Sequence, residues 1–119
     1  MKRLICLLAV VMAPTLGAAQ EVSVASGAVL RGLDKINGQT VDIELTAGRT
    51  SNFGSLQITL GECRFPVGNP AGNAYAELEI SEAGASGIVF SGWMIASSPA
   101  LSAMDHQRYD IWVMRCTTS

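Results

Sequence analysis

The stretch FSGWMIASSPALSAMDHQRYDIWVMRC, residues 90–116, decides the fold that we expect for this chain. It contains both tryptophans, the single histidine and one of the two tyrosines. Residues 90–95 are an apolar run, and residues 109–116 are rich in β-branched and aromatic side chains, so both are predicted to be strands. In the second strand, alternation would place Tyr109, Ile111, Val113 and Arg115 on one face and Asp110, Trp112, Met114 and Cys116 on the other. Because both faces are largely apolar, we expect a central strand covered on both sides.

A short helical turn, at about residues 99–104, is predicted between these two strands. Ser98 followed by Pro99 is a helix-start signal, because the hydroxyl can accept a bond from an orphan backbone N–H and proline is well placed at the first helical position. Leu101 and Met104 are three residues apart, so they would share one face of the turn and close the end of the sheet.

Upstream of this stretch, strand signals recur about every ten residues. The predicted strands are residues 28–34, 40–45, 50–53, 56–60 and 75–80, with loops at 66–73 and 81–87 and a flexible start at 20–27. Asn37-Gly38 is the strongest hairpin signal, and both central positions of such a turn need positive φ. The expected fold class is therefore all-β: a single small β-sandwich or partly open barrel with one short helical turn.

Residues 1–19 are typical of a bacterial secretory signal peptide, with Lys2 and Arg3 before an apolar segment and small residues at 17–19. The alternative is a membrane anchor, but an apolar run of about ten residues is too short to span a bilayer. We therefore expect export to the periplasm of a single β domain, residues 20–119. That part has six basic and ten acidic residues and no basic stripe, which argues against nucleic acid or anionic lipid as a partner.

Cys63 and Cys116 are the two cysteines that remain after the predicted signal peptide, which contains Cys6, is removed. An even pair in an oxidising compartment predicts a disulfide. Closing a loop of about fifty residues would stabilise the fold by about 4 kcal/mol in the chain-entropy model. The alternatives are two buried free thiols, or a zinc site, which two thiolates and one distant histidine would leave short of ligands.

The pattern FSGWM, ASSPAL, His106, Tyr109-Asp110, Trp112 and Cys116, preceded by VLRGLDKI at 29–36, FGSL at 53–56 and residues 74–80, resembles the family catalogued as domain of unknown function 2155. The resemblance covers about residues 28–116 and implies a small secreted, one-domain protein of alphaproteobacteria. It implies no activity. The chain departs from the family pattern after Cys63, where RFPVGNP stands in place of a proline- and glutamate-rich loop.

A serine-hydrolase set is one chemical hypothesis for the stretch. Ser97 or Ser98, His106, and Asp105 or Asp110 offer a nucleophile, a base and an orienting acid. The serines lack the Gly-x-Ser-x-Gly elbow that exposes a nucleophile beside an oxyanion hole. We therefore predict no catalytic residue and no enzyme activity.

A copper site is the second chemical hypothesis, because thioethers and imidazole suit cuprous ion. Met94, Met104, His106 and Met114 are all present, but no methionine is spaced with the histidine as a recognisable ligand motif. Methionines more often fill gaps in a core. We therefore predict no metal or cofactor, and expect His106 to cap the short helical turn or to bond a backbone carbonyl.

The remaining large side chains have structural and functional interpretations. At least one of Trp93 and Trp112 is expected to pack as core against the disulfide, and a tryptophan that is exposed instead would be the candidate interface anchor. Tyr109 could act as a tyrosine-corner-like lock. Glu77 and Glu79 are expected to form a solvated strand face rather than a paired-carboxylate site.

The function that we predict is a non-enzymatic periplasmic β module that binds another envelope protein or helps one to assemble. Its surface would be the loop 96–106 with the aromatic residues beside it. The interaction candidates are Trp93, Ser97, Ser98, Pro99, His106 and Tyr109. The alternatives are an inhibitor of a cell-wall hydrolase or protease, acting through a disulfide-rigidified loop, and a copper carrier.

Overall fold

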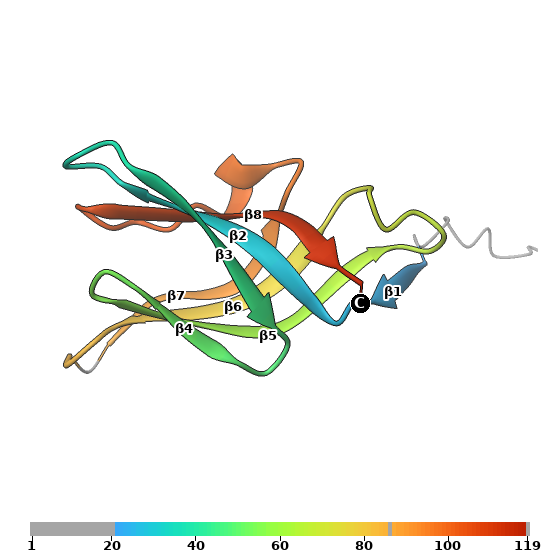
Figure 1. Cartoon of the computed structure of the whole chain (residues 1–119), viewed down its shortest axis with the longest axis horizontal. Helices are drawn as coiled ribbons and strands as arrows, with labels where there is room; N and C mark the ends of the chain where they lie inside the picture. Colours follow the sequence, from blue (N-terminus) through green and yellow to red (C-terminus); the bar gives the residue numbers. More distant parts are fainter. Residues whose placement is uncertain (1–20, 86, 119) are drawn as a thin grey trace, which may run out of the picture.

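Two antiparallel β-sheets pack face to face in the computed structural model, which describes residues 21–85 and 87–118 (Figure 1). The predicted signal peptide lies outside the described residues. The elements are β1 (Val22–Val24), β2 (Gly27–Asp34), β3 (Thr40–Thr46), β4 (Thr50–Phe53), β5 (Leu56–Pro66), β6 (Tyr75–Glu82), β7 (Ile88–Ile95), the 3-10 turn η1 (Pro99–Ser102) and β8 (Tyr109–Thr117). The prediction of an all-β fold is confirmed, and of the two expected forms, a small β-sandwich or a partly open barrel, the structure is a sandwich of two open sheets.

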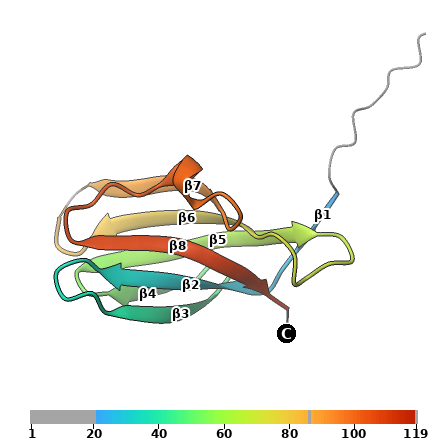
Figure 2. The same cartoon turned by 90° about the horizontal axis from the view of Figure 1, so that it is seen from above.

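The five-stranded sheet has the order β1-β5-β6-β7, with β4 also paired to β5, and the three-stranded sheet has the order β3-β2-β8. The chain passes between the sheets at Ala25 and Ser26, whose amides donate to the carbonyls of Cys63 and Thr117. On the opposite side, β7 and β8 are edge strands of different sheets. Residues 96–108, here called the crossover segment, run between them along the length of the sandwich (Figure 2).

Alternating apolar residues build the core between the two sheets. The inward positions with almost no exposed surface are Leu30, Leu56, Ile58, Leu60, Leu78, Ile80 and Ile111. Burying each of these side chains contributes roughly 1.5–3 kcal/mol, so this layer is the main stabilising contact between the sheets. The alternate residues of the same strands point away from the core, and those of β5, β6 and β7 form the outer face of the five-stranded sheet.

Strand β8 is an edge strand, so the prediction of a central strand is wrong. The register of β2 and β8 shifts between Val29 and Leu30, which pair with Arg115 and Val113, and Met114 is left as the extra residue of a bulge. The bulge turns Cys116 to the same side as Val113, although simple alternation predicted opposite faces.

Because of this turn, Cys116 meets Cys63 of β5 in a disulfide, with a Cα–Cα distance of 5.7 Å. The predicted disulfide is confirmed. It joins the two sheets covalently near the end where β1 lies.

Local signals placed most strands correctly, with four exceptions, one of which is that β7 begins at Ile88 rather than at residue 90. β1 pairs with β5 within the segment expected to be flexible, β5 continues to Pro66, and β6 continues to Glu82. The β2–β3 hairpin forms at the predicted place, but only Gly38, with φ of 74°, has positive φ, and Asn37 does not. The loop is longer than a two-residue turn, since the amide of Asp34 donates to the carbonyl of Gln39.

The predicted helical turn is confirmed as η1. Ser98 precedes it with φ of −142° and ψ of 62° and makes no side-chain capping bond, so the predicted capping role of Ser98 is wrong. Met104 is buried in the core as expected, and the side chain of Leu101 lies outside the described residues.

Candidate functional site

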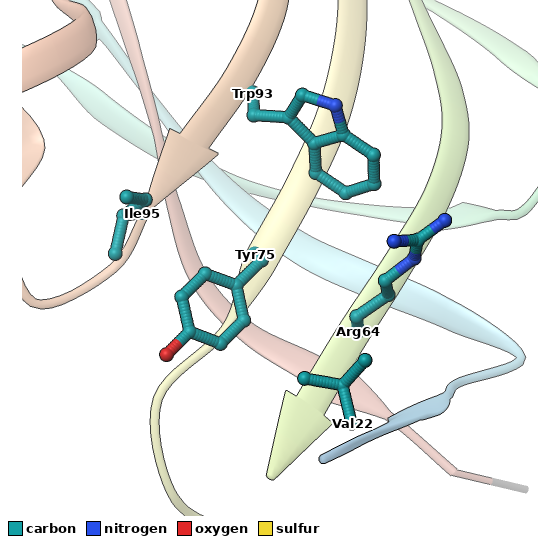
Figure 3. Close-up of a pocket in the computed structure, with 5 residues that line it drawn as sticks. All are labelled: Val22, Arg64, Tyr75, Trp93 and Ile95. Atoms are coloured by element: carbon teal, nitrogen blue, oxygen red, sulfur yellow. The ribbon is translucent and has the colours of Figure 1, made fainter. Parts of the chain in front are cut away.

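The outer face of the five-stranded sheet has a hollow of about 380 Å³ near β1. Five side chains line it: Val22, Arg64, Tyr75, Trp93 and Ile95 (Figure 3). Strand register brings them together, because Tyr75 of β6 pairs with Arg64 of β5 on one side and with Ile95 of β7 on the other. These five residues are called the aromatic hollow below.

Arg64 is held in place at the aromatic hollow by two neighbours. Its guanidinium carbon lies 4.8 Å from the centroid of the Trp93 ring, and its Nε donates to Glu62 Oε1 at 2.6 Å. A cation over an exposed aromatic face contributes about 0.5–1 kcal/mol. The site therefore presents a positioned cation beside an indole ring.

Asn73 fixes one rim of the aromatic hollow. Its Nδ2 donates to Ser97 Oγ at 2.8 Å and to the Tyr75 hydroxyl at 3.3 Å, and its Oδ1 accepts from the amide of Ser97 at 3.0 Å. Ser97 thus ties the start of the crossover segment to the loop before β6. The Ser97 hydroxyl therefore already accepts a hydrogen bond at the rim of the hollow.

Glu77 and Glu79 continue the outward row of β6 beyond Tyr75, and both are exposed, as expected of a solvated face. Glu77 pairs across the strands with Trp93, and Glu79 pairs with Ser91. Within the described residues, neither carboxylate makes a hydrogen bond or an ion pair. These two glutamates are called the acidic row below.

His106 lies at the other end of the sandwich. Its Nδ1 accepts from the amides of Arg108 and Tyr109, each at 3.0 Å. The ring proton is therefore on Nε2, which lies 2.5 Å from Glu82 Oε1 and donates to it. The expected bond to a backbone carbonyl is wrong, because the ring receives backbone amides and donates to a carboxylate instead.

Three charged residues near His106, namely Asp34, Arg108 and Lys35, have hydrogen-bond partners. Arg108 donates through Nε and Nη2 to the Asp34 carboxylate, with a shortest distance of 3.0 Å, and Lys35 Nζ donates to the His106 carbonyl. The bond from Arg108 lowers the pKa of Asp34, and bonds from Ser55 and then His106 lower the pKa of Glu82. The residues that make these interactions anchor the end of the crossover segment. They are called the polar end below: Asp34, Lys35, Glu82, His106 and Arg108.

Tyr109 packs in the core at the polar end and is only 6% exposed. Its ring meets Phe53 edge-on at 5.2 Å and stacks on His106 at 5.4 Å. The hydroxyl lies where a side chain on Gly54 would be, so Gly54, with φ of 58°, cannot be replaced without displacing it. Tyr109 therefore acts as a packing lock, and little of its ring is available to a partner.

The interaction candidates fall into three separate places. Trp93 and Ser97 lie at the aromatic hollow, and His106 and Tyr109 lie at the polar end. Pro99 lies beside Trp112 on the flank, where they line a second hollow of about 310 Å³, and Ser98 precedes that turn. Neither tryptophan belongs to the buried core, so the expectation of a tryptophan packed as core is wrong.

The chemical sets are also divided. Ser97 is hydrogen-bonded to Asn73, which precedes β6, and His106 is bonded to Glu82, the last residue of β6. The length of this eight-residue strand, about 23 Å, therefore separates the two side chains, and they do not form a triad. Met94 and Met104 are buried in the core, whereas Met114 is half-buried at the bulge of β8. In the described part of the chain, no three His, Cys, Asp or Glu side chains are grouped as metal ligands.

Most of the aromatic hollow was not predictable from the sequence. Val22, Arg64, Tyr75 and Ile95 gave no motif, although the outward position of Tyr75 was predictable from alternation. Their meeting depends on the pairing of four strands, for which the sequence carries no short-range signal.

Comparisons with known proteins agree with the resemblance described above. Residues 28–116 match the family model described as "Uncharacterized protein conserved in bacteria (DUF2155)". The chain is similar to the uncharacterized protein RP359 of Rickettsia prowazekii (strain Madrid E), with 31% identity over 87 residues, which are 71% of this chain. That match spans 56% of the length of the relative. No solved structure matches the chain. Among residues 21–85 and 87–118, no helix has the length and apolar character needed to cross a bilayer.

Proposed function

The chain belongs to the bacterial family DUF2155, and we propose that it is a non-enzymatic protein-binding module of the cell envelope. The binding surface is the aromatic hollow on the outer face of the five-stranded sheet. This places the surface beside the loop 96–106 that the sequence favoured, and it keeps two of the predicted residues, Trp93 and Ser97, at its centre and rim.

The observation that carries the proposal is the composition of the hollow. Tryptophan, tyrosine and arginine are the residue types that dominate binding hot spots, and Trp93, Tyr75 and Arg64 stand together there, each partly exposed. A hollow lined mainly by apolar groups offers a partner side chain an area to bury. The surface therefore has the chemistry of a protein interface.

The hollow is also well ordered for binding. Four of its five residues stand on paired strands β5, β6 and β7, and the disulfide at Cys63 is next to Arg64 in the chain. Asn73 bonds Tyr75, and Glu62 bonds Arg64. A site that is already ordered loses little conformational entropy when a partner binds.

The way in which the polar groups are used supports the non-enzymatic part of the proposal. Ser97 is bonded to Asn73, and His106 is bonded to Glu82 and to two backbone amides. These groups hold the crossover segment at its two ends. Their positions explain the fold without a catalytic role.

The envelope location is supported by the disulfide together with the predicted signal peptide. Disulfides form and persist in oxidising compartments, of which the bacterial periplasm is one. The bond between Cys63 and Cys116 lies between the two sheets and is suited to a structural role. Cell fractionation of the host, with a thiol-labelling assay for the two cysteines, tests this part directly.

Site-specific photo-crosslinking in the native host tests the binding surface. A benzophenone amino acid replaces Val24, which is 63% exposed and pairs with Arg64 beside the hollow. The matched control carries it at Ile36, which is 73% exposed in the β2–β3 turn. We expect a specific adduct from position 24 that is absent from position 36 and is lost when Trp93→Ala is added. An adduct that persists with Trp93→Ala, or no adduct at position 24, would contradict the proposal.

A further inference from the structure

The acidic row lies in line with the aromatic hollow, and the inference about its partner rests on the proposed function of that hollow. Tyr75, Glu77 and Glu79 are successive outward residues of β6. Alternate residues of a strand are about 6.6–7 Å apart, so the side chains of these three residues leave the strand at regular intervals along one line.

Space is available above this line. A shallow hollow of about 290 Å³ runs over β6 at Glu77 and Glu79, and the backbone of Gly92 lines it. Gly61 of β5 faces the same side without a side chain, and a Cβ built there would meet the Glu77 carboxylate. The neighbouring strands therefore leave the acidic row uncovered.

The charges of the acidic row are unbalanced. Within the described residues, Glu77 and Glu79 have no cationic partner, whereas Arg64, the cation of the hollow, is paired with Glu62. From residue 20 onward, ten acidic residues outnumber six basic ones, so the wider field also favours a cationic partner. An acidic or nucleic-acid segment would meet repulsion here.

We propose that the partner presents an extended basic segment to this face, with one apolar or aromatic side chain in the aromatic hollow and Lys or Arg two and four positions away over Glu77 and Glu79. An extended chain directs every second side chain to the same side at the spacing of the acidic row. Side chains one and three positions away would point to solvent.

Two synthetic heptapeptides of equal composition test the spacing. The first is acetyl-Gly-Trp-Ser-Lys-Ser-Lys-Gly-amide, and the second exchanges each lysine with the serine before it, which moves the charges to the opposite side of the extended chain. Their affinities for the protein are measured by NMR titration. Exposed ion pairs contribute little each, so we expect the first peptide to bind about fivefold more tightly, with a smaller difference at about 500 mM salt than at about 50 mM.

Two double variants locate the effect. Glu77→Gln/Glu79→Gln is expected to abolish the difference between the peptides. Glu44→Gln/Asp105→Asn makes the same change in net charge at exposed positions outside the acidic row and is expected to keep it. Equal binding of the two peptides to the unaltered protein, or no measurable binding of either, would overturn the inference.

The crosslinking experiment separates this inference from the proposed function. An adduct at position 24 that depends on Trp93 but persists unchanged in Glu77→Gln/Glu79→Gln would retain the binding module and overturn the basic segment. An adduct that depends on neither Trp93 nor the two glutamates would overturn both.

Discussion

The aromatic hollow and the polar end lie at opposite ends of β6 and use their side chains in different ways. At the polar end, Asp34 is paired with Arg108 and Glu82 with His106, and Tyr109 is buried beneath them. At the aromatic hollow, the large apolar side chains remain partly exposed. The acidic row beside it has no partner in the described part of the chain.

The difference shows that a concentration of notable residue types does not by itself mark a site. At the polar end, the histidine and the charged residues are occupied in holding the crossover segment against β2 and β6. At the aromatic hollow, Trp93 contacts Arg64 but still faces solvent, where a partner can reach it. Exposure, more than residue type, therefore distinguishes the two ends.

Removal of the disulfide is expected to have the largest effect, because this bond joins the sheets near the aromatic hollow. The change is Cys63→Ala/Cys116→Ala, and the bond closes a sequence separation of 53 residues. We expect the free energy of unfolding to fall by about 4 kcal/mol in urea denaturation. A loss below about 1 kcal/mol would mean that the noncovalent contacts at this end suffice to hold the sheets together.

Replacement of one aromatic residue at each end should separate a packing role from a surface role. Tyr109→Ala removes a buried ring that contacts Phe53 and is expected to lower the free energy of unfolding by about 3 kcal/mol or more. Trp93→Ala removes a partly exposed ring and is expected to cost about 1 kcal/mol or less. Equal losses in the two variants, measured by urea denaturation, would remove the distinction between the ends.

Acid sensitivity of stability is expected to come from the polar end. Hydrogen bonding holds the pKa of Asp34 below its ordinary 3.8 and that of Glu82 below its ordinary 4.5. A carboxyl group with a lowered pKa in the folded state stabilises the fold above the ordinary value, and this contribution is lost as pH falls through the lowered pKa.

The urea midpoint should therefore decline as pH falls from about 5 to about 2, and Asp34→Asn should decline less steeply over that range while being less stable at neutral pH. Glu77→Gln is the matched control at the other end of β6 and should follow the unaltered protein. A decline of equal slope in all three proteins would place the sensitive groups elsewhere.

The smallest effect on stability is expected for the acidic row. Glu77→Gln/Glu79→Gln removes two exposed charges without a partner among the described residues, so the free energy of unfolding should change by no more than about 0.5 kcal/mol. Thermal and urea denaturation measure the change. A loss above about 1 kcal/mol would show that the two glutamates stabilise the fold, which would contradict a role in partner binding alone.

Several features of the fold were predictable because they depend on neighbouring residues. Alternation in residues 56–60 and 75–80 places apolar side chains on one side of an extended chain, and this period marks strands without knowledge of their partners. The disulfide followed from the count of cysteines after residue 19. The turn at Pro99 followed from the conformational limits of proline.

The candidate site was predicted only in part. Trp93 was named because of its residue type, and Ser97 because of its place in the loop. Tyr75 and Arg64 were not named, since they are 18 and 29 residues before Trp93 in the sequence and meet it only across paired strands. His106 was predicted to cap the nearby helical turn or to bond a backbone carbonyl. Its acceptor in the structure is Glu82, which lies beyond the predicted end of that strand at residue 80.

The sequence by itself determined most of the extended segments, the pairing of the two cysteines and the main turns, because these follow from local period, composition and backbone limits. The tertiary structure decided that β8 is an edge strand, that a bulge at Met114 turns Cys116 inward, and that residues 90–116 are divided between two ends of the sandwich. The physical reason is that strand register and sheet order are set by hydrogen bonds between residues far apart in the chain. Alternation gives two sides to every strand, and only the pairing decides what each side meets.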